Sequence, residues 1–152
     1  SKAIELINNK FNKRHRLIIV GEGYLRPKLE KINCITLLGL KNQKEIIKIS
    51  KTCDIFCLPS IYEPWGVVVH EMIALGFPII CSKNCGSSFD LVEEGINGYK
   101  FDPYDINSIE DAIIKITSLT TKQLDYFSSN SNLIAKKINH ENWNKTLISM
   151  IN

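Results

Sequence analysis

Short apolar runs alternate along the chain with longer segments whose apolar residues recur every three or four positions. The short runs are rich in β-branched residues and mostly end at glycine or proline, which predicts buried strands. These expected strands cover residues 16–20, 34–38, 54–58, 77–81 and 99–101. Helices are expected at 42–51, 66–75, 107–119, 121–138 and 141–151, and helix-like segments also begin at Ser1 and after Gly23.

Two expected helices begin with a capping-box pattern, in which a polar residue is followed three positions later by glutamate. Asn42 with Glu45 opens the first of them, and Asn107 with Glu110 opens the second. Strands that alternate with helices pair in parallel, so the sequence predicts an α/β fold with a doubly wound parallel sheet and helices on both faces.

The loops that follow the strands are the expected place for function, because ligands of doubly wound sheets bind beyond the carboxyl ends of the strands. These loops are residues 21–23, 39–42, 59–65 and 82–86. The sequence contains no internal repeat and no low-complexity linker, and we expect residues 1–152 to form a single domain.

Composition narrows the classes of function. Of 152 residues, 44% are hydrophobic and 23% charged, which is an ordinary balance for a soluble domain. The formal charge of +3 includes no long basic run, so it does not favour nucleic acid but suits anionic ligands such as nucleotide diphosphates. The sequence contains no apolar stretch of about 18 residues and no signal peptide, and we expect a cytoplasmic protein.

Five cysteines are present, and we expect them to be reduced cytosolic thiols because their number is odd and four of them fall in or beside expected strands. The pairs Cys53/Cys57 and Cys81/Cys85 repeat a four-residue spacing, which raises a zinc hypothesis. Cys53 and Cys57 flank an apolar run, however, and structural zinc sites usually use tighter spacings. We therefore expect small core residues and no metal.

The most informative segment is residues 59–71, at a junction from strand through loop to helix. The expected helix starts near Gly66, where the first backbone N–H groups have no partner within the helix. With the helix dipole, these groups favour an anion. Glu71 lies on a helix that is apolar nearly all round, so the pattern predicts a buried carboxylate that needs a partner. Its side chain leans back toward the helix start, where the two hydroxyls of a ribose are suitable partners.

Glu63 lies in the loop just before this helix, from which it could accept hydrogen bonds from a sugar. An alternative of equal weight on local sequence is that Glu71 pairs with a buried basic residue and Glu63 is a solvated loop charge. The short motif of Gly21 and Gly23 is a weak signal. It lacks the third glycine of a dinucleotide-binding fingerprint and the lysine end of a P-loop.

Taken in order, these residues resemble the group 1 glycosyltransferases, also called glycosyltransferase family 4. Glu63 and Glu71 reproduce the spacing of that family's two glutamates, with seven residues between them. Further matches fall at residues 17–23 with Leu29 beyond, 37–39, 54–60, 71–78 and 97–99. The resemblance covers about residues 2–119 and implies the GT-B architecture, in which two Rossmann-like domains face each other across a cleft. This chain resembles the second, donor-binding domain.

The resemblance also implies parts that this sequence does not contain. The first strand of the family domain, and a phosphate-binding arginine, are expected before Ser1, and the acceptor domain is missing. Relatives often carry a double glycine where this chain has Cys85 and Gly86. His70 occupies a position that is often small or polar in relatives, and we expect it to be a core or interface histidine.

The family's residue roles transfer by position. Glu71 would bind the ribose, and Glu63 would lie at the donor sugar. Lys2, matched by its nine-residue offset from Phe11, would contact phosphate; a solvated terminal lysine is an equal alternative. Backbone amides that would hold the sugar and diphosphate belong to Trp65, Gly66, Val67 and Val68. Residues that would border the nucleotide are Gly21, Gly23, Leu40 and Lys41.

The resemblance implies a retaining glycosyltransferase that moves a sugar from a UDP- or GDP-sugar to a glycan or lipid-linked acceptor, without a metal cofactor. Polysaccharide biosynthesis and peripheral membrane association of the whole enzyme would be typical. For this chain alone, a sugar-nucleotide-binding module without activity is the expected state, because half of the cleft is missing. A UDP-sugar epimerase-like domain and a purely structural Rossmann-like domain are further alternatives.

Overall fold

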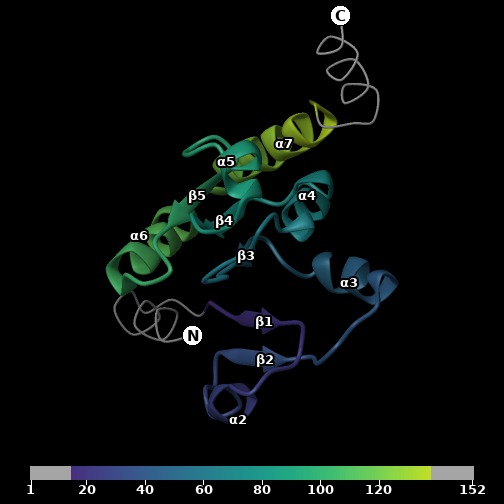
Figure 1. Cartoon of the computed structure of the whole chain (residues 1–152). Coiled ribbons are helices and arrows are strands. Elements are labelled where there is room, and N and C mark those ends of the chain that lie inside the picture. Colours follow the sequence, from purple (N-terminus) through teal and green to yellow (C-terminus); the bar gives the residue numbers. More distant parts are fainter. Residues whose placement is uncertain (1–14, 138–152) are drawn as a thin grey trace, which may run out of the picture.

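A computed structural model describes residues 15–137, and its strands and helices alternate along the chain (Figure 1). This alternation confirms the α/β fold predicted from the sequence. The expected helical segments that begin at Ser1 and cover 141–151 lie outside the described residues. The elements are β1 (Leu17–Ile19), α2 (Arg26–Leu29), β2 (Ile35–Leu37), α3 (Gln43–Ser50), β3 (Phe56–Leu58), α4 (Val67–Ala74), β4 (Ile79–Ser82), α5 (Ser87–Leu91), β5 (Gly98–Phe101), α6 (Ile106–Thr117) and α7 (Thr121–Lys137).

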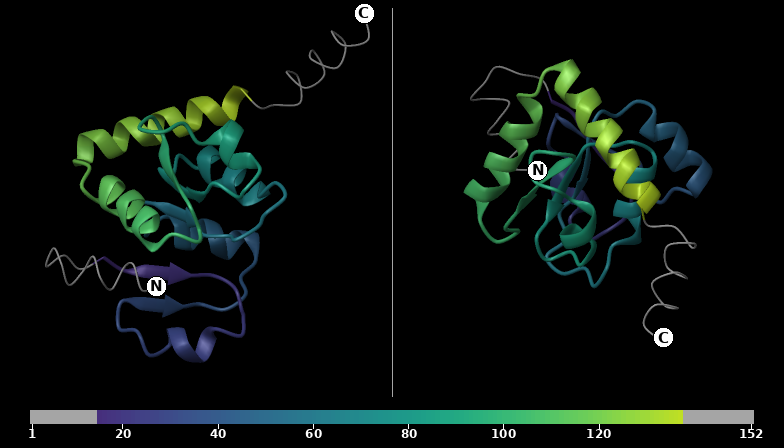
Figure 2. Two further views of the ribbon diagram at one scale, coloured as in Figure 1. Left: turned by 60° about the vertical axis from the view of Figure 1, so that its left-hand side comes forward. Right: turned by 90° about the horizontal axis from the view of Figure 1, so that it is seen from above.

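The strands form two parallel sheets. β1 pairs with β2, with Ile18 opposite Thr36, and β4 pairs with β3 on one side and β5 on the other, with Ile80 opposite Cys57 and Tyr99. Figure 1 and the left view of Figure 2 show β1 between β2 and the three-stranded sheet. This is the order of a doubly wound sheet whose first strand separates two wings. The strand that separates the wings in the family domain is expected before Ser1, so β1 of this chain (Leu17–Ile19) is not that strand.

Helices cover both faces of the three-stranded sheet, and β4 is buried along its whole length. Because successive side chains of a strand point to opposite faces, Ile79 and Cys81 pack with α4 and α7, whereas Ile80 packs with α6. Figure 2 shows α6 in green and α7 in yellow against this sheet. A strand buried on both faces has no polar side to expose, which explains the uninterrupted apolar run that predicted it.

Side-chain caps set the starts of two helices. Asn42 and Glu45 each accept a hydrogen bond from the other's backbone amide at 3.0 Å, which confirms the capping box predicted for α3. The capping box predicted at Asn107 and Glu110 is wrong. Asp105 caps α6 instead, and its carboxylate accepts from the Asn107 amide at 2.9 Å. The upstream carboxylate is already the cap, so the helix starts at Ile106 and Asn107 lies inside its first turn.

The short helix α5 was not predicted, because five residues are too few to show a helical period. Four strands also begin later than expected, β1 and β2 by one residue and β3 and β4 by two. β3 starts at Phe56 rather than at residue 54, and β4 starts at Ile79 rather than at residue 77. Ile55, Phe77 and Pro78 in front of these strands are apolar but lie outside the ladder, whereas Asp54 is charged. An apolar run therefore indicates burial more reliably than it indicates strand pairing.

A buried polar network joins α7 to the sheet. The Ser131 hydroxyl donates to the Phe77 carbonyl oxygen at 2.6 Å and lies 3.4 Å from the Asn97 amide nitrogen. Asn97 also donates to the Leu91 carbonyl at 2.9 Å and accepts from the Glu93 backbone amide at 2.8 Å. Asn97 and Ser131 are completely buried. Each bond therefore replaces one that water would make, and α7 is fixed to the turn before β5.

Two neighbouring positions of α7 test this packing. Ile134 is 5% exposed in the core beside α4, whereas Leu133 is 56% exposed. We expect Ile134→Ala to lower the free energy of unfolding by about 2–5 kcal/mol, because it removes buried methylene groups and leaves a cavity. Leu133→Ala should change it by less than about 0.5 kcal/mol. Urea unfolding measures both, and equal effects would show that α7 is not packed as described.

Candidate functional site

Backbone hydrogen bonds fix Glu63 between the loop after β3 and the loop after β4. The Glu63 amide donates to the Asn84 carbonyl at 3.1 Å, and the Gly86 amide donates to the Glu63 carbonyl at 3.0 Å. These two bonds form a short parallel bridge between the loop after β3 and the loop after β4. The Asn84 side-chain amide donates to the Ile61 carbonyl at 3.0 Å. The half-buried Glu63 side chain therefore starts from a fixed backbone at the carboxyl edge of the sheet.

Gly66 begins α4 in a conformation that other residues rarely adopt. Its φ is 86°, in the left-handed region, and a Cβ there would lie 2.6 Å from the Cys85 sulfur. Glycine is thus required both by the backbone and by the close approach. No side chain caps the helix at this position. The first amides of α4, those of Val67 and Val68, have no acceptor within the helix, and the dipole favours an anion in front of them.

Glu71 is exposed, so the predicted buried carboxylate is wrong, and so is the alternative of a buried ion pair. The buried face of α4 consists of Val69, Met72 and Ile73. Glu71 lies on the other face together with Val67, which is 63% exposed. The apolar composition misled the prediction because the outward positions are also apolar. Glu71 still lies about one turn from the helix start, and its side chain leans toward that end.

Other candidate residues gather at the two-stranded sheet. The Gly21 amide donates to the Gly39 carbonyl at 2.8 Å, which joins the loops after β1 and β2. Gly21 and Gly23 line a hollow of about 210 Å³ beside these loops. Leu40 is 78% exposed, and the Lys41 ammonium lies 3.3 Å from the Glu45 carboxylate. The structure therefore places the predicted residues in two groups, one at the end of each sheet.

Two predicted positions do not join these groups. Lys2 lies outside the described residues. His70, on α4, is half-buried, and its Nε2 atom is buried without a hydrogen-bond partner among residues 15–137. This burial agrees with the interpretation of His70 as a core or interface residue.

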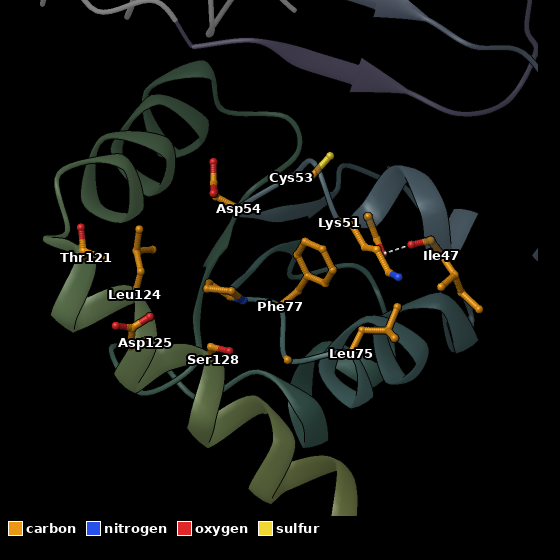
Figure 3. Close-up of a pocket in the computed structure, with 13 residues that line it drawn as sticks. Ile47, Lys51, Cys53, Asp54, Leu75, Phe77, Thr121, Leu124, Asp125 and Ser128 are labelled. Atoms are coloured by element: carbon orange, nitrogen blue, oxygen red, sulfur yellow. Dashed lines mark hydrogen bonds between the residues drawn. The ribbon is translucent and has the colours of Figure 1, made fainter. Parts of the chain in front are cut away.

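The larger hollow lies at the opposite edge of the sheet, with a volume of about 470 Å³ (Figure 3). Asp54 precedes β3 and Phe77 precedes β4, so this hollow opens at the amino ends of the strands. Figure 3 shows Leu124 and Ser128 of α7 across from Leu75. It contains none of the predicted site residues, and ligands of doubly wound sheets bind at the other edge. We do not assign the site to it.

All five cysteines lie among the described residues and none forms a disulfide. Burial raises the pKa of the Cys81 thiol well above its usual range, because a thiolate there would lose its hydration. Residues 15–137 contain no group of three His, Cys, Asp or Glu side chains placed to hold a metal ion. In the same residues, no helix is long and apolar enough to cross a bilayer.

A family model described as "Glycosyl transferases group 1" matches residues 1–143. The chain belongs to the group 1 glycosyltransferases. Its α/β structure, with parallel sheets flanked by helices, matches that of GT-B glycosyltransferases. The resemblance given by the two glutamates and the ordered motifs is thereby confirmed at the level of the family.

Two curated glycosyltransferases are similar to most of this chain. An uncharacterized glycosyltransferase of Methanocaldococcus jannaschii is 30% identical over 118 residues, which cover 72% of this chain and 30% of that protein. The UDP-Gal:alpha-D-GlcNAc-diphosphoundecaprenol alpha-1,3-galactosyltransferase of Escherichia coli is 30% identical over 132 residues, which cover 82% of this chain and 33% of that protein. The chain thus spans about a third of the length of these relatives.

Solved structures show the same fold. TarM superposes with a TM-score of 0.81 at 21% identity, over 99% of this chain and 31% of its own. Anabaena HepE in complex with UDP superposes with a TM-score of 0.78 at 22% identity, over 99% of this chain and 44% of its own.

Sequence reasoning missed Asn84 and Ser87. Both bind the backbone of the loop that carries Glu63: Asn84 contacts the Ile61 carbonyl, and the Ser87 hydroxyl lies 3.3 Å from the Gly66 carbonyl. Small polar residues after a strand gave a turn signal but did not indicate which loop they would contact. That information comes only from the pairing of β3 with β4.

Gly66 and Gly95 both have a positive φ, but only Gly66 is closely packed. Substitutions at the two positions therefore distinguish the cost of backbone strain from the cost of overpacking. A Cβ at Gly66 would meet Cys85, whereas a Cβ at Gly95, with φ of 73°, would meet nothing within 4 Å. We expect Gly95→Ala to cost about 1–2 kcal/mol of stability, from the left-handed backbone alone. Gly66→Ala should cost about 1–3 kcal/mol more, because it also overpacks the loop junction. Equal losses in urea unfolding would contradict the described contact of Gly66 with Cys85.

Proposed function

We propose that this chain is the donor-binding domain of a retaining glycosyltransferase, which transfers a sugar from a nucleotide-diphosphate sugar to a glycan or lipid-linked acceptor. The observation that carries the proposal is the junction at Gly66. There a half-buried glutamate, an uncapped helix start and an exposed glutamate about one turn further follow each other within residues 63–71. The family supplies the reaction class, and the geometry suggests which part of the donor each group meets.

The helix start is the proposed diphosphate site. The amides of Val67 and Val68 have no acceptor within α4, and the helix dipole adds partial positive charge in front of them. A leaving diphosphate gains negative charge as the bond to the sugar breaks. Donors fixed in place before the reaction stabilise that charge without further reorganisation. The amides of Trp65 and Gly66 lie next to them in the chain and complete the proposed cradle for sugar and phosphate.

Glu71 is the proposed ribose ligand. A carboxylate accepts two hydrogen bonds, which suits two neighbouring hydroxyls. The Glu71 side chain is exposed in the structure of residues 15–137, so a ligand can bind it without breaking a buried ion pair. Glu63 is the proposed ligand of the donor sugar, since it precedes the helix start in the loop after β3. Both glutamates position the donor, and neither is required as a general base.

The remaining assignments depend on the family pattern. Gly21 and Gly23 leave room for the nucleotide at the hollow beside β1, and Leu40 and Lys41 border the base. Lys2 contacts a phosphate. Catalysis requires no metal in this scheme, because helix amides and basic groups balance the charge of the diphosphate. In this proposal an acceptor domain forms the other side of the cleft. The whole enzyme is cytoplasmic and associates peripherally with a membrane surface.

The HepE complex supports a nucleotide ligand, since its solved form holds UDP and has the same fold as this chain. The name of the E. coli relative describes transfer of galactose from UDP-Gal to a diphosphoundecaprenol-linked sugar. These are properties of those proteins. They motivate titration of this chain with UDP, GDP and ADP, each compared with its sugar-bearing form.

Substitution of Glu71 tests the ribose assignment. We expect Glu71→Ala to weaken nucleotide binding about 10- to 100-fold, because hydrogen bonds to a charged group contribute about 1.5–3 kcal/mol. Asp111→Asn is the matched control: it also removes an exposed negative charge from a helix, but on α6. Calorimetric titration gives the affinities. If Glu71→Ala binds like the parent chain, the ribose assignment is wrong.

Substitution of Glu63 tests the sugar assignment. We expect Glu63→Ala to leave the affinity for the bare nucleotide nearly unchanged and to lower that for the sugar nucleotide about 10-fold, at about 1.4 kcal/mol. The ratio of the two dissociation constants, measured by calorimetry, isolates the sugar contribution. Equal losses for both ligands would contradict the role. Release of an epimerised sugar nucleotide without any acceptor would instead favour the epimerase-like alternative.

A further inference from the structure

A short segment after β4 packs against the loop that leads into α4. We call residues 84–87 the clamp segment. Its backbone bonds to the loop of residues 61–66 at three points: the Glu63 amide to Asn84, the Gly86 amide to Glu63, and the Ser87 amide to the Trp65 carbonyl at 2.8 Å. A Cβ at Gly86 would overlap the Pro64 carbonyl oxygen. The two segments therefore lie in direct backbone contact, with no room for a side chain between them.

Two side chains of the clamp segment add hydrogen bonds to the loop that leads into α4. The Cys85 thiol donates to the Trp65 carbonyl at 3.1 Å, and the Ser87 hydroxyl donates to the Gly66 carbonyl at 3.3 Å. The two groups lie 3.3 Å from each other. Both residues are 0% exposed. Burial of the two side chains reduces the competition of water for these contacts.

These bonds act on the first turn of α4. The Gly66 carbonyl accepts from the Val69 amide at 2.9 Å and from the Ser87 hydroxyl, so one oxygen joins the helix to the clamp segment. The Glu63 Cγ atom lies 3.1 Å from the position that a Cβ on Gly66 would take. A shift of the Gly66 peptide would therefore move both the free amides of α4 and the Glu63 side chain.

Glu71 is placed differently. It lies about one turn into α4, on a helix fixed by the packing of Val69, Met72 and Ile73 in the core. The clamp segment makes its hydrogen bonds one turn earlier, at Trp65 and Gly66. Loss of a clamp contact should therefore disturb the groups at the helix start and leave Glu71 in place.

We propose that Cys85 and Ser87 are positioning residues, which set the sugar and diphosphate part of the donor site through the carbonyls of Trp65 and Gly66. Asn84 supports them through the Ile61 carbonyl. This inference rests on the proposed function. It adds that affinity for the sugar and diphosphate depends on the clamp segment, whereas affinity for the nucleoside does not.

The test is a pair of titrations of the nitrogen-labelled chain, followed by NMR. The probes are uridine with UDP-glucose and guanosine with GDP-mannose. We expect Ser87→Ala to raise the dissociation constant for the sugar nucleotide about fivefold, the usual effect of one neutral hydrogen bond, and to leave that for the nucleoside unchanged. The amide signals of Val67 and Val68 should shift in the unliganded variant.

Ser88→Ala is the matched control. Ser88 is also 0% exposed, but its hydroxyl has no hydrogen-bond partner among the described residues. Its removal should leave both affinities and the two amide signals unchanged. Cys85→Ser, which keeps a donor toward Trp65, should bind the sugar nucleotide more tightly than Cys85→Ala. Asn84→Ala, at a half-exposed position, provides a clamp variant with little risk to folding.

The outcomes separate this inference from the proposed function. A parent chain that binds no probe overturns the proposed function and the positioning role with it. A parent that binds, with Ser87→Ala indistinguishable from Ser88→Ala, overturns the positioning role alone. Equal weakening of nucleoside and sugar nucleotide by the clamp variants also overturns it, because it would show a general loss of structure.

Discussion

The bridge between the loops after β3 and β4 is the contact on which the candidate site depends. The bond of the Glu63 amide to Asn84, and that of the Gly86 amide to Glu63, extend the pairing of the two strands beyond their last ladder residues. A loop of this length would otherwise have many conformations, each costing free energy to exclude. Here the cost is met by backbone bonds and by a buried junction that accepts only glycine at Gly66 and Gly86. A rigid site is thereby built on a loop, although loops are usually the more mobile part of a fold.

The two sheets contribute different parts of the site. The three-stranded sheet is covered on both faces and supplies the helix start and both glutamates. The two-stranded sheet carries Gly21 and Gly23, and no residue of β1 or β2 is fully buried. In a doubly wound sheet these wings meet at the first strand, and the ligand crevice forms where the strand order reverses. The part of the site that is ordered by a packed core is therefore the part proposed for the sugar and diphosphate.

Much of the fold can be predicted from the sequence, because runs of apolar residues indicate which segments are buried. The presence of β4, although not its first residue, and the capping box of Asn42 and Glu45 each have a direct physical cause, and both were predicted correctly. Contacts between distant segments were not predictable in the same way. Nothing in the order of residues indicates that Ser87 reaches the Gly66 carbonyl, since that contact exists only after β3 and β4 pair. The position of Glu71 was wrong for a related reason: composition does not distinguish an apolar residue that faces the core, such as Val69, from one that faces outward.

The exposure of Glu71 changes how its affinity should arise. A buried carboxylate would have lost its hydration during folding, and the ligand would then restore hydrogen bonds that the protein already lacks. An exposed carboxylate keeps its water until the ligand displaces it, so the net gain per hydrogen bond is smaller. Tight binding then requires several groups to be held in place beforehand, since each ordered group reduces the entropy lost on association. Glu71 is ordered by the core packing of α4, and the helix start by the clamp segment. On this reasoning the specificity for a donor comes less from any single strong contact than from two independently fixed parts of one helix.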